Sequence, residues 1–238
     1  MSRRETAALV LVLGLALALR LSLMRAPACI SGDGVQYVYL AASIAAGEGW
    51  YHPVFSPGYS LLIAALHAST GTPLEQSGRL VAAFSSVLAC VPAWLLWRAS
   101  LGPVAAGLGC LVLAVWPFSV WLGSGVYAEP PALLLLLGGL YLASGAREAA
   151  RPYWALGAGL CWGAAAWIKP EALAWAGIGA AALAAPRWAG PSASLTSWAR
   201  GLGAAVLLLA AAACRRWPAR LSWCSSWTRV SCTRCSRC

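Results

Sequence analysis

The sequence has very little charge for its length. Of its 238 residues, 10% are charged, seven are acidic and two are histidines. A soluble domain carries about 25% charged residues. The hydrophobic fraction is 61% and the mean hydropathy is +0.71. These proportions argue against a soluble protein and predict an integral membrane protein.

The apolar segments lack the alternating pattern of a β-barrel and are rich in Ala and Leu, so helices are predicted to satisfy the backbone in lipid. A spanning helix needs about 20 apolar residues. The sequence therefore predicts an all-α, polytopic transmembrane bundle within residues 1–213. Seven spans are expected, at 6–24, 77–97, 102–122, 130–146, 153–168, 171–186 and 200–214. Residues 57–68 are too short to span and predict an interfacial or re-entrant helix.

The arginines predict the orientation. If the N-terminus is cytoplasmic, the clusters between spans all fall on the cytoplasmic side, as the positive-inside rule requires. They are Arg3, Arg4, Arg98, Arg147, Arg151, Arg187 and Arg200. Because these residues lie between apolar spans, the net charge of +10 does not indicate a nucleic-acid partner; the predicted partners include membrane lipids. The first span is expected to be a retained anchor rather than a cleaved signal peptide, in a multi-pass protein of the cell membrane.

A different set of polar residues is then expected on the outer face. It comprises Asp33, Glu48, His52, Glu75, Arg79, Glu129, Lys169 and Glu171, and it includes the only Asp and the only Lys of the chain. The main extramembrane feature is the loop 25–76. Two short surface helices are predicted in it, at 35–46 and 57–68. Asp33 is expected to cap the first, and Pro57 to open the second.

Familiar catalytic motifs are absent. The chain has no GxGxxG, Walker or HExxH motif, and its two histidines do not form a catalytic triad; His67 is expected to pack on an apolar helix. In the Arg- and Cys-rich tail 214–238, the CxxCxxC spacing lacks a fourth ligand, so no metal site is assigned. This tail is not expected to be a domain. Its composition suggests a product translated out of frame or truncated.

Three segments together resemble a known group. They are Gly32-Asp33-Gly34-Val35-Gln36-Tyr37 followed by Ser56-Pro57-Gly58-Tyr59, then Tyr127-Ala128-Glu129-Pro130, and finally 163–171 (GAAAWIKPE). In this order they resemble glycosyltransferase family 39 and the RgtA/B/C/D-like enzymes, GT-C membrane proteins related to protein O-mannosyltransferases. The resemblance covers residues 5–190. It implies transfer of a sugar from a polyprenyl-phosphate carrier to a lipid, glycan or protein acceptor outside the cytoplasmic membrane.

The resemblance also implies roles for residues. Asp33 matches the catalytic acid/base of the family, although many relatives have Asp-Glu where this chain has Asp33-Gly34. That departure removes a second carboxylate and weakens the case for a shared metal or acceptor role; a divalent cation is kept only as a possible cofactor. Lys169 is a candidate for the donor phosphate, on which a lysine acts as a point charge. The other candidates for substrate or donor-phosphate binding are Glu129, Glu171, Tyr37, His52 and Arg79. Glu171 could pair with Lys169 or with Arg79.

Two other functions compete with sugar transfer. One is a transporter or flippase of a lipid-linked or small substrate, in which intramembrane charges mark the pathway. The other is a non-catalytic membrane subunit or an inactive fragment, since family members usually continue through further spans. Charges gathered at one surface favour surface chemistry over transport.

Overall fold

The computed structural model describes residues 1–24, 30–52, 54–149 and 152–184, and in this part of the chain all regular structure is helical. The helices are α1 (Arg3–Met24), α2 (Gly32–Ala45), α3 (Pro57–Thr70), α4 (Leu74–Leu88), α5 (Cys90–Leu101), α6 (Pro103–Val115), α7 (Pro117–Ser124), α8 (Glu129–Ala149), α9 (Pro152–Ile168) and α10 (Ala172–Ala184). The all-α prediction is confirmed for these residues.

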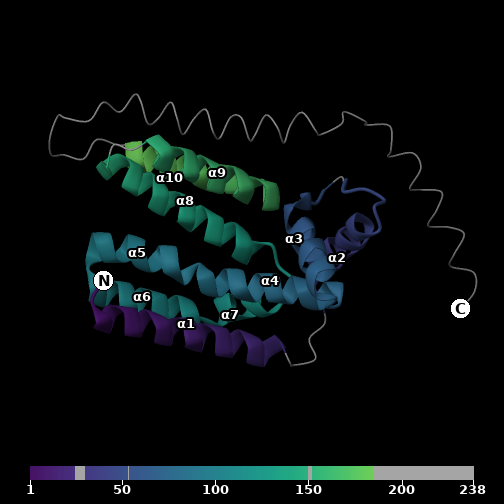
Figure 1. Cartoon of the computed structure of the whole chain (residues 1–238), viewed down its shortest axis with the longest axis horizontal. Helices are drawn as coiled ribbons and strands as arrows, with labels where there is room; N and C mark the ends of the chain where they lie inside the picture. The colour runs from purple at the N-terminus through teal and green to yellow at the C-terminus, as the bar shows by residue number, and fades with distance from the viewer. Residues whose placement is uncertain (25–29, 53, 150–151, 185–238) are drawn as a thin grey trace, which may run out of the picture.

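The long helices run side by side, and the two short helices α2 and α3 lie across one end of them (Figure 1). The N-terminus lies at the opposite end. There the Arg98 Nε lies 3.1 Å from the Glu5 carboxylate, joining the end of α5 to the start of α1. Arg98 and the N-terminus therefore share one end of the bundle, and the loop helices occupy the other. Which compartment each end faces stays a prediction.

Three described helical segments are long and apolar enough to cross a membrane. They are Arg3–Met24, the consecutive helices across Leu74–Leu101, and Glu129–Ala146; a bent pair, α6 with α7, makes a fourth if it counts as one span. The chain is thus a multi-pass membrane protein, but seven spans are not confirmed. The helices α9 and α10 have 17 and 13 residues, and the predicted span 200–214, like the tail, lies outside the described residues.

Proline breaks one of the predicted spans, and a second span contains a single turn residue near a proline. A turn at Ala89 separates α4 from α5, three residues before Pro92. The axis then bends by 57° between α6 and α7, where Pro117 follows Trp116. Proline lacks the amide that continues a helix, and its ring clashes with the preceding turn. The stretch 102–122 is therefore two helices, not the straight span that its hydropathy predicts.

Small residues bring α8 and α9 together. Ala143, Ala155 and Ala158 are buried between them, and a Cβ on Gly139 would overlap the Trp162 indole. The Trp162 Nε1 donates to the Leu136 carbonyl at 3.2 Å. Close backbone approach through small residues is the usual way in which membrane helices associate. Because the two helices are joined by a short connection, the start of α8 and the end of α9 lie at the same end of the bundle (Figure 1).

Candidate functional site

An ion pair joins the start of α8 to the end of α9. The Lys169 Nζ lies 2.7 Å from the Glu129 Oε1. Glu129 is the first residue of α8, where the helix dipole favours a carboxylate, and Lys169 follows the last residue of α9. The Lys169 side chain is 31% exposed and the Glu129 side chain 41%, so the pair adds little to the stability of the fold. The pair lies at the same end of the bundle as the loop helices.

The helix α2 brings Asp33 and Tyr37 to the same end. Ser31 caps α2 by accepting a hydrogen bond from the Gly34 amide at 3.1 Å. The expectation that Asp33 caps the helix is therefore wrong: Ser31 precedes the helix and holds that position. Asp33 lies in the first turn, exposed, and its carboxylate makes no hydrogen bond or ion pair to the described residues. Its carboxylate is accessible from outside the bundle.

The environment of Tyr37 keeps its hydroxyl protonated. The pKa of Tyr37 is raised above its usual value, chiefly by burial and then by the charges of Glu129, Asp33 and Glu171. The phenol is therefore neutral and can donate a hydrogen bond. Tyr37 is thus influenced by acidic residues of all three sequence segments.

The segment 56–59 docks the loop on the end of α9. The Ser56 hydroxyl donates to the Trp167 carbonyl. A Cβ on Gly58 would collide with the same carbonyl group, so only glycine allows this approach. Tyr59 is buried, and its hydroxyl donates to the Gly78 carbonyl at 2.8 Å. The first and third sequence segments therefore touch directly, through backbone as well as side chains.

Val126, the residue before the segment 127–130, lies against both α2 and α4. Val126 is 2% exposed. A Cβ on Gly34 would lie 3.1 Å from the Val126 carbonyl, and one on Gly78 would lie 3.0 Å from its side chain. Val126 thus packs against the starts of α2 and α4, three residues before Glu129. A larger residue at position 34 or 78 would push these helices apart.

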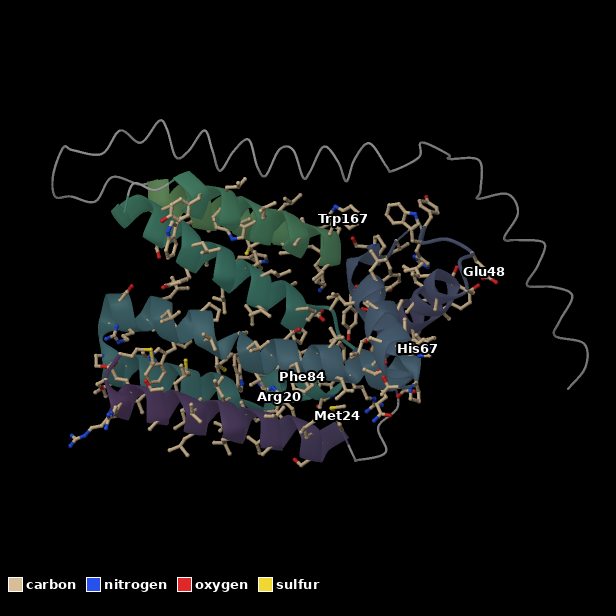
Figure 2. All side chains as sticks on the ribbon, in the orientation of Figure 1. Arg20, Met24, Glu48, His67, Phe84 and Trp167 are labelled. Carbon is tan, nitrogen blue, oxygen red and sulfur yellow. The ribbon has the colours of Figure 1, made fainter. Side chains whose placement is uncertain are left out.

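Aromatic rings line the same end of the bundle. The Trp50 and Trp167 rings are stacked with centroids 5.9 Å apart, and Trp167 lies at the end of α9 facing the loop helices (Figure 2). The Phe55 ring meets Tyr37 at 5.0 Å and His52 at 5.1 Å, both edge to face. Flat, partly exposed aromatic rings therefore lie at the same end of the bundle as the Lys169–Glu129 ion pair.

Comparison with protein families supports the reading of these segments. The family of dolichyl-phosphate-mannose-protein mannosyltransferases matches residues 51–217. The chain belongs to this family. The match includes the segments at 56–59, 127–130 and 163–171, but it begins after Asp33. Curated proteins and solved structures give no match.

In this mannosyltransferase-family chain, the structure brings most of the predicted site residues together. Glu129, Lys169, Tyr37, Asp33 and Glu171 are linked by the ion pair or by their effect on Tyr37. His52 joins them through Phe55. The structure pairs Lys169 with Glu129 rather than with Glu171, while Arg79 lies 2.7 Å from Glu75, one turn away on α4.

Sequence reasoning missed several contributors to this end of the family fold. Ser56 and Gly58 were seen only as parts of a motif, although the spacing Ser-Pro-Gly signals a helix start that closely approaches another element. Trp50 and Trp167 gave no signal, because their stacking joins distant positions. Among the described residues there is no group of three or more His, Cys, Asp or Glu side chains that could hold a metal.

His52 gives the loop a pH dependence. Its Nδ1 accepts from the amides of Val54 at 3.2 Å and Phe55 at 3.0 Å, so only a ring unprotonated at Nδ1 fits. Burial lowers the pKa of His52 below 6.5. The unfolded chain then binds a proton more readily than the folded chain. The contribution of His52 to the stability of the fold is fully present above about pH 6.5, its pKa in the unfolded chain. This contribution is lost as the pH falls toward the lower pKa that His52 has in the folded chain.

We expect the thermal unfolding midpoint of the protein in detergent to fall between about pH 7.5 and about pH 5.5. The His52→Asn variant is the matched control, because an Asn oxygen can accept from the same two amides without titrating. The variant should lose less stability over this interval. An equal loss in both proteins would contradict a role for His52.

Proposed function

We propose that this chain transfers a sugar from a polyprenyl-phosphate carrier to a lipid, glycan or protein acceptor at the extracytoplasmic face of the cell membrane. The observation that carries the proposal is the meeting of three separate sequence segments at one end of the bundle. Asp33, Glu129 and Lys169 come from these segments, and the family match covers the two segments that hold Glu129 and Lys169.

Asp33 is proposed as the catalytic base. It takes the proton of the acceptor hydroxyl while the hydroxyl oxygen forms a bond to the anomeric carbon. The bond from that carbon to the phosphate oxygen breaks, its electron pair leaves with the lipid phosphate, and the configuration inverts. The carboxylate also faces the positive charge that develops on the sugar ring. Exposure of Asp33 at the start of α2 gives an acceptor access to it.

Lys169 is proposed to bind the phosphate of the donor. Its ammonium has three N–H donors, of which Glu129 takes one at 2.7 Å. Glu129 thus fixes the position of the Lys169 ammonium, and the other two N–H groups of the ammonium stay available for phosphate oxygens. The pair lies at the end of α9 that is next to the loop helices. We propose that the headgroup of the lipid carrier binds there. A phosphate arriving there would bring the negative charge that Lys169 stabilises as the leaving group departs.

The other candidates are proposed to hold the substrates. The neutral Tyr37 hydroxyl and the ring of His52 can hydrogen-bond sugar hydroxyls, and the stacked Trp50 and Trp167 offer a flat apolar surface. Glu171, exposed two residues after Lys169, and Arg79, on the outer part of α4, are placed for acceptor or headgroup contacts. Neither is assigned a step in the reaction.

The direct test is sugar transfer by the full chain in lipid vesicles. We expect radiolabel from mannose linked to a polyprenyl phosphate to appear in an added acceptor, and no transfer from the nucleotide-linked sugar. Transfer from the nucleotide sugar alone would contradict the proposed donor. Uptake of label into the vesicles without any glycosylated product would instead favour the transport function.

A further inference from the structure

An arginine lies inside the first span. Arg20 is fully buried in α1, and Figure 2 shows it pointing into the bundle. Its Nε donates to the Ser86 hydroxyl at 2.8 Å and its Nη2 to the Ser119 hydroxyl at 2.9 Å. Its Nη1 donates to the Ala16 carbonyl at 2.9 Å and to the Ala114 carbonyl at 3.1 Å. One side chain thus bonds to α1, α4, α6 and α7.

None of these partners carries a charge, and within the described residues no carboxylate forms an ion pair with Arg20. An arginine within a membrane span is unfavourable, and such residues are usually retained for function. Arg20 is not near an exposed surface where it could meet a substrate. Its effect must therefore come from the helices that it holds.

The contact with Ala114 explains how the chain tolerates the bend between α6 and α7. In an unbroken helix, this carbonyl would accept from the amide of Phe118. The 57° bend at Trp116 and Pro117 separates the two groups. Neighbouring side chains commonly satisfy the backbone groups that a proline break releases within a membrane. Here Arg20 supplies the donor, and it bonds to Ser119 on the far side of the bend as well.

The helix α7 is shaped to receive this side chain. A Cβ on Gly123 would lie 2.6 Å from the Arg20 Nε and 2.9 Å from the Ser86 hydroxyl. Glycine at this position therefore lets α7 lie directly on the guanidinium. The next residue, Ser124, turns its hydroxyl back to the Val120 carbonyl at 2.9 Å and ends the helix.

The end of α7 leads directly into the candidate site. Two residues after Ser124, the buried Val126 packs against Gly34 beside Asp33, and against Gly78 on α4. Glu129 follows three residues later and binds Lys169. A shift of α7 would therefore move the contact with the Asp33 helix and the start of the Glu129 helix together.

We propose that Arg20 is a positioning residue, which holds the bent arrangement of α6 and α7 and so sets Asp33 relative to the Glu129–Lys169 pair. The inference rests on the proposed function for the roles of these three residues. We call the set of hydrogen bonds from Arg20 to α1, α4, α6 and α7 the Arg20 clamp. The clamp rests only on these four hydrogen bonds and on the close approach of Gly123 to Arg20.

The test compares Arg20→Met and Arg20→Lys with the wild-type chain in lipid nanodiscs, by hydrogen exchange and by transfer kinetics. In Arg20→Met we expect the amides of residues 113–129 to exchange at least about tenfold faster, because four hydrogen bonds are lost and the loss of even one charged hydrogen bond has an effect of this size. The kcat should fall by a similar factor while the donor KM stays the same. Arg20→Lys, which keeps a donor, should recover part of both effects.

Arg98→Met is the matched control, because Arg98 pairs with Glu5 at the opposite end. It should leave exchange in 113–129 unchanged. Unchanged exchange in Arg20→Met would overturn the clamp, as would a rise in donor KM without a fall in kcat. If Arg20→Met does not insert, Ser119→Ala removes one partner, and unchanged exchange there is equally decisive. Faster exchange in a chain whose wild type transfers no sugar would refute the proposed function and leave the clamp in place.

Discussion

Replacement of Asp33 by Asn is expected to lower the kcat for sugar transfer by about 100-fold or more, the range for loss of a general base. The amide cannot take the proton of the acceptor hydroxyl, yet it matches the carboxylate in size. Because Asp33 is exposed and Ser31 provides the cap of α2, the fold should not change. The measurement is single-turnover transfer from the lipid-linked donor, together with membrane insertion of the variant.

Glu48→Gln is the matched control for this experiment. Glu48 is an exposed carboxylate on the same loop, after the end of α2, and has no role in the proposed site. Its loss should leave kcat within about twofold of wild type, since surface substitutions have small effects. Normal transfer by Asp33→Asn would remove Asp33 as the base, whatever the control shows.

Replacement of Lys169 by Ala is expected to raise the KM for the donor by about 10- to 100-fold. A hydrogen bond to a charged group contributes about 1.5–3 kcal/mol, and about 1.4 kcal/mol corresponds to tenfold in affinity. The substitution also leaves Glu129 without its partner, so that its carboxylate repels the phosphate. Donor KM should change more in this variant than in Asp33→Asn, which acts on the acceptor side.

Two further variants separate these causes. Lys169→Arg keeps the positive charge and should keep most of the donor affinity, although its geometry differs. In the double variant Lys169→Ala with Glu129→Gln, the repulsion is absent, and donor KM should lie between wild type and Lys169→Ala. An unchanged donor KM in Lys169→Ala would count against the phosphate role, and the mechanism would need another cation.

The loop helices could be predicted because their signals are local. Gly47 and Gly71 adopt left-handed backbone after α2 and α3, and Pro57 begins α3. The error at Asp33 was also local: two suitable caps stood two residues apart, and only the backbone path shows that Ser31 takes the position. A sequence pattern predicts the end of a helix to within a few residues. It does not decide which of two neighbouring polar residues caps the helix.

The site itself depended on distant contacts. Lys169 and Glu129 are 40 residues apart in sequence, and Glu171 was as plausible a partner until the packing of α8 on α9 placed the ends of these helices together. Arg20 was overlooked because one charge in a long apolar stretch barely changes its hydropathy. Pro117 did carry a signal for a bend, yet the stretch around it is apolar enough to suggest a straight span.

The attachment of the loop to α9 uses mainly the backbone of Trp167: Ser56 bonds to its carbonyl, and Gly58 lies against the same group. A carbonyl is present whatever side chain the position carries. Evolution or an engineer can therefore exchange the indole, and with it the surface stacked on Trp50, without detaching the loop. If the proposed function holds, the position of the loop can therefore stay the same while the ring surface that would contact the sugar varies.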